Sequence, residues 1–200
     1  MEELRVGLVS APHHESLVGL LCELHSYYNE GSSVPHGLVR SYLLECLLAP
    51  TSPLDLVVAS REHSQVLGFA AISLTHSLVE PTAEKRHHCW LKELYVRSSS
   101  RSLGAGKALM SWVARYAVAH GCCRIDWPVQ ATNARGIAFY ESLGAKQVVE
   151  RLSYRLSELL RNSFPRLDGQ RSTHAGCSAG TIFMPSLAAR CDSDRNTRSR

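Results

Sequence analysis

Long apolar runs are missing from this sequence of 200 residues. No stretch approaches the roughly 18 consecutive apolar residues that a membrane-spanning helix needs, so we expect no such helix. The first ten residues, MEELRVGLVS, lack the basic region and the apolar block of a secretory signal. We therefore expect a cytoplasmic protein without a membrane partner.

Paired cysteine motifs are missing as well. The seven cysteines are an odd number and show no C-x-x-C spacing, which favours reduced thiols over a disulfide framework. The triplet His87, His88 and Cys89 contains metal-ligating residue types. Adjacent side chains point in different directions, however, and no second ligand pair follows at the spacing of a zinc site. The sequence therefore predicts no metal site.

Net charge is lacking over most of the chain. The formal net charge of +4 arises in residues 161–200, where seven arginines accompany three aspartates, while the preceding 160 residues hold 15 basic and 15 acidic side chains. A nucleic-acid-binding domain gathers its basic residues on a folded face, so we expect no nucleic-acid partner. Instead, we predict one folded domain over residues 1–157 and a disordered basic extension over residues 158–200.

Hydrophobic periodicity predicts an α/β or α+β fold with a mixed sheet. The pattern predicts a strand, two helices and a hairpin in the first half of the chain, and alternating strands and helices in the second half. Gly68, inside an apolar run, indicates a bulge or a close backbone approach. Strands are expected at residues 4–10, 54–60, 66–74, 89–96 and 123–129, with one last strand or two at 146–157. Helices are expected at residues 13–28, between Pro35 and Pro50, from the glycine-bearing turn at 101–107 to Gly121, and from Asn133 to about Gly144. Such a sheet binds ligands at the carboxyl ends of its strands.

The stretch RSLGAGK, residues 101–107, places two glycines between an expected strand and an expected helix. Free N–H groups and the helix dipole make such a turn suitable for phosphate. The Walker pattern does not fit, because it needs Gly where the chain has Arg101 and Ser or Thr where it has Ala108. The dinucleotide fingerprint needs a glycine at Leu109. The failed Walker pattern argues against nucleotide hydrolysis.

The pattern that fits is Arg-x-x-Gly-x-Gly, which runs from Arg101 through Gly104 to Gly106. It resembles the acetyl-CoA pyrophosphate loop of the GNAT superfamily of N-acetyltransferases. LKELYV upstream is similar to the family's fourth strand, and NARGIAFYESLGA, residues 133–145, is similar to its late helix that faces CoA. The resemblance implies a mostly antiparallel sheet flanked by helices, with acetyl-CoA bound where two central strands splay apart.

The resemblance implies a set of cofactor contacts. The strand segment contributes a backbone N–H of Val96, freed by a bend of the strand, as the donor to the thioester oxygen. Position 102 is usually glycine in the family, and we expect only a modest loss of affinity from Ser102, provided that its φ is negative. The implied cofactor-binding residues are Leu94, Tyr95, Val96, Arg101, Ser102, Gly104, Ala105, Gly106, Lys107, Asn133 and Tyr140.

Acetyl transfer from a thioester to an amine needs an acid and a base. Tyr140 is implied to protonate the leaving thiolate. It follows Asn133 by two helical turns, so the two side chains share a helix face about 10 Å apart along the axis. Asn133 is also a good helix N-cap, and Tyr140 could instead be a packing residue. Glu93 is the candidate base, because a charged residue is uncommon within an otherwise apolar strand and such residues often have a functional role. The alternative is a glutamate that is merely hydrogen-bonded or exposed at the edge of the sheet.

The acceptor is implied by the block RIDWPVQATNARGIAFYESLGA, which most resembles the diamine, polyamine and aminoglycoside acetyltransferases. In that branch, acidic residues near the first two helices attract a cationic substrate, which points to Glu23 and Glu30. Glu93 is a further candidate for binding the substrate. Amines of proteins, either lysine side chains or N-termini, are the alternative substrates. A non-catalytic acyl-CoA sensor is the alternative of another class, although a pure binder needs no acid such as Tyr140. The sequence is also compatible with a homodimer.

Overall fold

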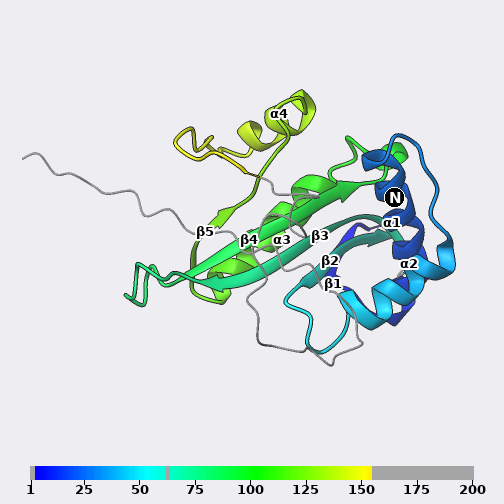
Figure 1. Cartoon of the computed structure of the whole chain (residues 1–200), viewed down its shortest axis with the longest axis horizontal. Coiled ribbons are helices and arrows are strands. Elements are labelled where there is room, and N and C mark those ends of the chain that lie inside the picture. Colours follow the sequence, from blue (N-terminus) through cyan, green and yellow to red (C-terminus); the bar gives the residue numbers. More distant parts are fainter. Residues whose placement is uncertain (1–2, 62–63, 155–200) are drawn as a thin grey trace, which may run out of the picture. The chain divides into compact units, whose positions relative to one another are not determined.

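The computed structural model describes residues 3–61 and 64–154 (Figure 1). The extension expected at residues 158–200 lies outside this range. The chain divides into two units, Met1–Ile137 and Ala138–Arg200, which are described separately. None of the helices within the described ranges is long and apolar enough to cross a membrane.

The first unit is built on a five-stranded sheet in the order β1-β2-β3-β4-β5 (Figure 1). The first three pairings are antiparallel, and β4 pairs with β5 in parallel. The expected mixed, mostly antiparallel sheet is therefore confirmed. The strands are β1 (Arg5–Leu8), β2 (Asp55–Arg61), β3 (Gln65–His76), β4 (His87–Val96) and β5 (Cys122–Asp126).

The helices form where apolar residues recur at helical spacing and where turn residues stop them. Pro35 is the N-cap of α2, and Gly121, with a φ of +70°, follows the end of α3. The helical elements are η1 (Ala11–His13), α1 (His14–Tyr28), α2 (His36–Tyr42), the π-helical turn η2 (Leu43–Leu47), η3 (Ser98–Ser100), α3 (Ala105–Ala119) and α4 (Ala134–Ser142).

Both faces of the sheet are covered, because successive strand residues point to opposite faces and both sets are buried. On one face, α1 and η2 close a core whose buried members are Leu17, Val18, Leu20, Leu43, Leu56, Val58, Val66, Phe69, Ala71 and Tyr95. On the other face lies α3, which contacts all five strands and buries Leu109 and Val113.

Three expected strands differ from the structure, and the first of them, expected at residues 4–10, spans only Arg5–Leu8. β5 ends at Asp126, just before Trp127 and Pro128, because proline cannot donate to a strand ladder. The expected strand at 146–157 is wrong for residues 146–154, which form no strand. Polar and apolar residues alternate poorly there, so no register buries one face of the segment; Val149 and Leu152 are exposed.

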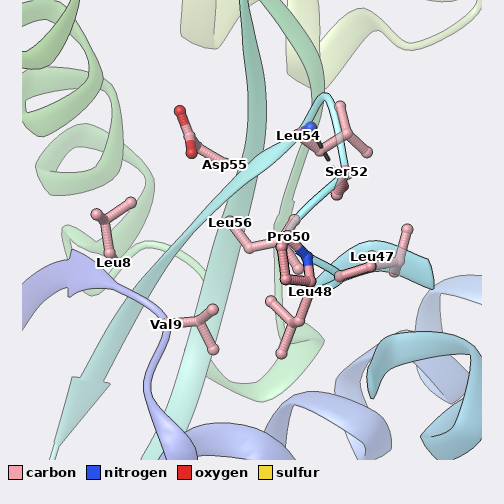
Figure 2. A pocket seen from close by; sticks show the side chains of 10 residues that line it. Leu8, Val9, Leu47, Leu48, Pro50, Ser52, Leu54, Asp55 and Leu56 are labelled. Carbon is pink, nitrogen blue, oxygen red and sulfur yellow. Dashed lines mark hydrogen bonds between the residues drawn. The ribbon is translucent and has the colours of Figure 1, made fainter. Parts of the chain in front are cut away.

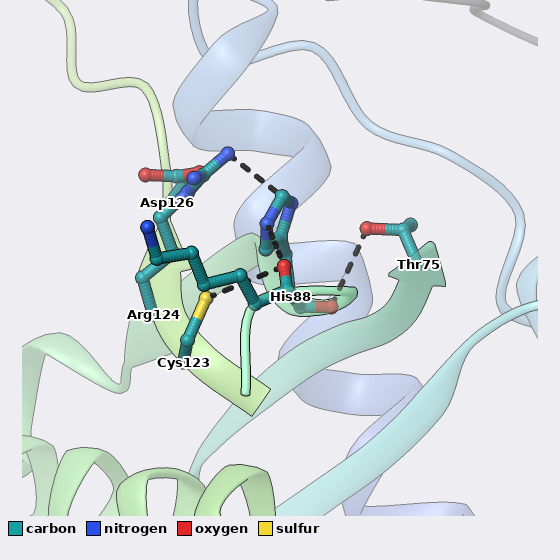
Figure 3. A network of polar contacts seen from close by, with 6 residues as sticks. Thr75, His88, Cys123, Arg124 and Asp126 are labelled. Carbon is teal, nitrogen blue, oxygen red and sulfur yellow. Dashed lines mark hydrogen bonds and ion pairs between the residues drawn. The ribbon is translucent and has the colours of Figure 1, made fainter. Parts of the chain in front are cut away.

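Polar contacts tie the β3–β4 hairpin to β5 at the end far from the glycine turn (Figure 3). The His88 Nε2 lies 3.1 Å from the Lys85 carbonyl oxygen, and the Arg124 guanidinium lies 3.1 Å from His88 Nδ1. Arg124 also pairs with Asp126 at 2.6 Å. Burial raises the pKa of the nearby Cys89 thiol to about 11. Among the described residues, no group of three or more His, Cys, Asp or Glu side chains is arranged to hold a metal ion.

Candidate functional site

The neighbouring strands β4 and β5 separate along their length. They pair from His87 and Cys122 to Trp90 and Asp126, and β4 then continues to Val96 while β5 has ended. Within the described residues, no strand is paired with β4 on this side over residues 91–96, which we call the open edge. Backbone groups at the open edge are therefore available to a ligand.

A β-bulge at Lys92 sets which backbone groups face the open edge. Ala71 of β3 pairs with Glu93 and Ile72 pairs with Leu91, which leaves Lys92 as the extra residue. After the bulge, the Arg97 N–H donates to the Leu67 carbonyl across the β3–β4 ladder. Since antiparallel hydrogen bonding alternates along a strand, the N–H groups of residues 94 and 96 point away from β3.

The expected role of Val96 fits this geometry, although its contact with a thioester stays a prediction. Its N–H points to the open edge, while its carbonyl oxygen accepts a 3.1 Å hydrogen bond from Arg101 Nε. Opposite Val96, a Cβ on Gly68 would lie 2.7 Å from the Tyr95 carbonyl oxygen. The close approach indicated by Gly68 in the sequence is therefore confirmed.

The glycine turn, residues 101–107, joins the open edge to the N-terminus of α3. Gly104 is the N-cap residue with a φ of +86°, and the first helical hydrogen bond runs from the Ala108 N–H to the Gly104 carbonyl. The N–H groups of residues 105–107 thus have no acceptor inside the helix. No acidic residue lies in this first turn. The turn can therefore receive a phosphate, as expected from the sequence.

Ser102 departs from the expectation. A negative φ was expected at this position, but the φ of Ser102 is +65°, in the left-handed region that residues with a Cβ rarely adopt. The expectation is wrong, because the turn keeps the backbone geometry of a glycine although the residue is serine. Backbone strain is thus stored at the turn.

Ser102→Gly is expected to stabilise the protein by about 1 kcal/mol, after the greater chain entropy of glycine offsets part of the relieved strain. For a chain of this size, this corresponds to a rise in Tm of about 2 to 4 °C, measurable by calorimetry. The control is Ser102→Ala, which removes the hydroxyl but keeps the strained φ and should not raise the Tm. Equal Tm values for the two variants would contradict the interpretation that the positive φ of Ser102 strains the backbone.

Two arginine side chains lie near the turn. Arg101 faces β4, since its Nε donates to Val96 and its guanidinium lies 5.6 Å from the centre of the Tyr95 ring. Arg135, which was not among the predicted site residues, donates from its guanidinium to Ser102 Oγ at 3.2 Å. The only sequence signal for it was its position two residues after the helix cap. Arg135 thus adds a positive charge beside the turn.

Asn133 is confirmed as the N-cap of α4. Its Oδ1 accepts a 2.9 Å hydrogen bond from the Gly136 N–H. A Cβ at position 136 would lie 2.7 Å from Asn133 Nδ2, so glycine leaves room for the cap. This cap sets the start of the helix that carries Arg135.

Glu93 lies on the α1 side of the sheet and is held at both carboxylate oxygens. The Tyr28 hydroxyl donates to Oε2 at 3.1 Å, and the Leu94 N–H donates to Oε1 at 3.2 Å. Burial raises the pKa of Glu93 above the usual value of a glutamate, and these two hydrogen bonds offset only part of the rise. A carboxylate with a raised pKa is a better proton acceptor near neutral pH.

Glu23 and Glu30, the other two candidates for attracting a cation, differ in their surroundings. Glu23 accepts hydrogen bonds from the Tyr95 hydroxyl at 3.1 Å and the Ser98 N–H at 3.0 Å, and it pairs with Arg97 at 3.5 Å. Burial by itself raises the pKa of Glu23, but these donors together hold it below its usual value. These contacts favour a structural role for Glu23. Glu30 is exposed in the turn after α1, with a φ of +52°.

Tyr140 belongs to the second unit and lies in the last turns of α4. Its side chain is partly buried, and its ring is 5.2 Å from the ring of Phe139. The Leu143 N–H donates to its carbonyl oxygen and closes the end of the helix. Its role as an acid stays a prediction.

A cavity of about 270 Å³ lies elsewhere in the first unit (Figure 2). It opens at the Asp55 end of β2, whereas Ala59, four residues on, is at the level of Gly68 and Val96. The residues that line it include Val9, Leu47, Leu48, Pro50, Leu54 and Leu56. The cavity is thus separate from the open edge and the glycine turn.

The sequence is similar to those of known acetyltransferases. The sequence model of the acetyltransferase (GNAT) family matches residues 18–145. The chain is 33% identical over 79 residues to L-ornithine N5-acetyltransferase NATA1 of Arabidopsis thaliana, a match that covers 40% of this chain and only 33% of that relative. The chain thus spans about a third of the length of this curated relative.

Solved structures share the fold. An integron cassette protein from the mobile metagenome of V. cholerae matches with a TM-score of 0.69 and 29% identity, over 76% of this chain and 91% of that one. The aminoglycoside N-acetyltransferase AAC(6')-Iy, solved in complex with CoA, matches with a TM-score of 0.62 over 78% of this chain and 97% of that one. At 21% identity, the second likeness shows the fold alone.

Proposed function

Because this chain belongs to the acetyltransferase (GNAT) family, we propose that it transfers an acetyl group from acetyl-CoA to a primary amine of a small cationic molecule, such as a diamine, a polyamine or an aminoglycoside. The observation that carries the proposal is the open edge of β4, which leads directly into the glycine turn. A thioester and a pyrophosphate that belong to one ligand can therefore be bound by neighbouring segments of one chain.

The pyrophosphate of acetyl-CoA is bound by the glycine turn. The N–H groups of residues 105–107 donate to it, and Arg135 and Lys107 add positive charge. The Val96 N–H donates to the thioester oxygen as negative charge develops on it. Metal ions have no part in the proposal.

The chemical step is a direct transfer in a ternary complex. The ionised Glu93 carboxylate takes a proton from the acceptor ammonium, directly or through water, and the freed lone pair forms the new C–N bond at the thioester carbon. When the C–S bond breaks, the thiolate takes a proton from the Tyr140 hydroxyl. As the amide forms, its nitrogen gives up a second proton, which passes through solvent to restore the Tyr140 hydroxyl, and Glu93 releases to solvent the proton that it took.

A small cationic acceptor is supported by charge and by the relatives. The partly buried Glu93 carboxylate of β4 contacts Tyr28 at the end of α1, and the exposed Glu30 lies in the turn that follows this helix. Both carboxylates attract a cation. The relatives named above include an ornithine acetyltransferase and an aminoglycoside acetyltransferase. Amines of protein chains and a non-catalytic acyl-CoA sensor are the alternatives that the experiment must separate.

The experiment is a thiol-release assay with acetyl-CoA and a panel of diamines, polyamines, ornithine, aminoglycosides and lysine or N-terminal peptides. We expect thiol release with small amines and none with peptides. Release with peptides alone would replace the proposed substrate class. Binding of CoA without release for any amine would indicate the sensor.

Acetyl-CoA is expected to raise the Tm of the protein, because a ligand specific to the folded state stabilises it by mass action. Gly104→Glu should abolish this rise, since the added carboxylate repels phosphate. The control is Gly104→Ala, which bears the same positive-φ strain without the charge; no atom lies within 4 Å of the new Cβ. Differential scanning fluorimetry with and without acetyl-CoA measures both variants, and an undiminished rise in Gly104→Glu would contradict the assignment of the turn.

A further inference from the structure

The C-terminal end of α1 contacts the open edge of β4 through side chains. Tyr28, the last residue of the helix, donates to Glu93 Oε2, while the strand's own Leu94 N–H occupies Oε1. The two donors come from different elements, one from the helix and one from the strand. The orientation of Glu93 is therefore set jointly by the strand and by a helix 65 residues away in the sequence.

A second set of contacts anchors the same helix independently of Tyr28. Glu23, five residues earlier in α1, accepts from the Tyr95 hydroxyl and the Ser98 N–H and pairs with Arg97. These partners lie at the end of β4 and at the start of the segment that leads into the glycine turn. Removing the Tyr28 hydroxyl would therefore leave the helix in place.

The ring of Tyr28 is held by a neighbour as well. Tyr27 packs edge-on against Tyr28 with the ring centres 5.2 Å apart, and it lies 6.2 Å from the Tyr95 ring. A phenylalanine at position 28 keeps these ring contacts and loses only the hydroxyl. The effect of the Tyr28 hydroxyl on Glu93 can therefore be separated from that of its ring.

We infer that Tyr28 is a positioning residue for the acetyl transfer: its hydroxyl orients the Glu93 carboxylate, stabilises its ionised form and so sets the pH at which the amine proton is accepted. The inference rests on the proposed function, in which Glu93 is the base. Tyr28 itself takes no proton in this scheme and acts through Glu93.

The charges around Glu93 agree with this role. Burial raises its pKa, whereas the Tyr28 hydroxyl, the Leu94 N–H and the charge of Lys92 lower it. From β3, the residue paired with Glu93 is the uncharged Ala71. On α1, the nearby Glu23 is paired with Arg97 of the segment after β4. Tyr28 is thus the donor to Glu93 that comes from outside its own strand.

The first test follows the Glu93 carboxyl directly and needs no activity. In full-length protein labelled with ¹³C at the glutamate carboxyl carbons, the Glu93 signal is identified by its loss in Glu93→Gln. We expect Tyr28→Phe to move the titration midpoint of this signal to higher pH, because a donor to the charged form is lost. The matched control is Tyr27→Phe, the adjacent tyrosine, which should leave the midpoint unchanged.

The second test measures the pH profile of kcat/KM with the best amine from the panel. Tyr28→Phe should shift the acidic limb to higher pH, lower kcat/KM by about 3- to 10-fold at about pH 6.5 and recover toward the wild-type value at high pH. The KM for acetyl-CoA should not change. A purely structural role would lower activity at every pH alike.

The outcomes separate the inference from the proposed function. If the wild type transfers acetyl groups but Tyr28→Phe and Tyr27→Phe give the same NMR midpoint and the same pH profile, the inference is overturned. If the wild type transfers none, the proposed function fails, and the NMR midpoint alone decides whether Tyr28 stabilises the Glu93 charge. In the Glu93→Gln background, Tyr28→Phe should leave the residual pH profile unchanged, because the two residues act as one unit.

Discussion

Tyr140→Phe is expected to lower kcat by about 10²- to 10⁴-fold, while the affinity for CoA stays nearly constant. The ring still packs against Phe139, but the proton for the leaving thiolate must then come from water. A group that acts only in the transition state changes turnover and leaves binding unchanged. The measurement is kcat from thiol release, together with the CoA dissociation constant from calorimetry.

The control for this variant is Tyr154→Phe, which removes a hydroxyl from a largely exposed tyrosine of the same unit. It should behave as the wild type. Small and equal changes in kcat and in CoA affinity for Tyr140→Phe would leave Tyr140 as a packing residue. The non-catalytic sensor would then become the leading hypothesis.

Glu93→Gln is expected to lower kcat/KM by about 10²- to 10⁴-fold near neutral pH, because an amide cannot accept the proton of the amine. The amide oxygen can still accept from the Leu94 N–H, and the amide nitrogen can donate to the Tyr28 oxygen, so the local contacts persist. Glu45→Gln, at an exposed position on η2, is the matched control. An active Glu93→Gln enzyme would remove Glu93 from the base role.

The same variant should gain stability relative to the wild type as the pH rises. The folded-state pKa of Glu93 lies above its unfolded value because of burial. The folded protein therefore binds more protons in this window, and the wild type loses stability as the pH rises from the unfolded pKa through the folded pKa. The glutamine side chain of the variant has no such titration, so the Tm of the variant relative to that of the wild type should be higher at about pH 8 than at about pH 4. A constant difference would contradict the raised pKa.

Short-range patterns in the sequence predicted most of the fold. Helical spacing of apolar residues located α1 and α3, and the two apolar runs around residue 62 formed the β2–β3 hairpin as expected. The segment at 146–154 was the main error. Its β-forming residues have no alternating pattern that would bury one face, and β propensity alone does not make a strand.

The candidate site was predicted in part. Gly104 and Asn133 could be assigned because a turn and a helix cap depend on a few neighbouring residues. Arg135 was missed, since its contact with Ser102 joins segments 33 residues apart. The positive φ of Ser102 was missed as well, because serine itself does not require it.

By itself, the sequence determined which residue types stand at the end of the fourth strand and in the turn that follows, and hence the class of chemistry proposed for them. Only the tertiary structure decided where β4 separates from β5, that the bulge lies at Lys92, and that Glu23 anchors α1 while Glu93 faces Tyr28. These features depend on strand register and on contacts between residues 65 to 72 positions apart. The free energy of such contacts is set by packing and burial, which no local pattern specifies.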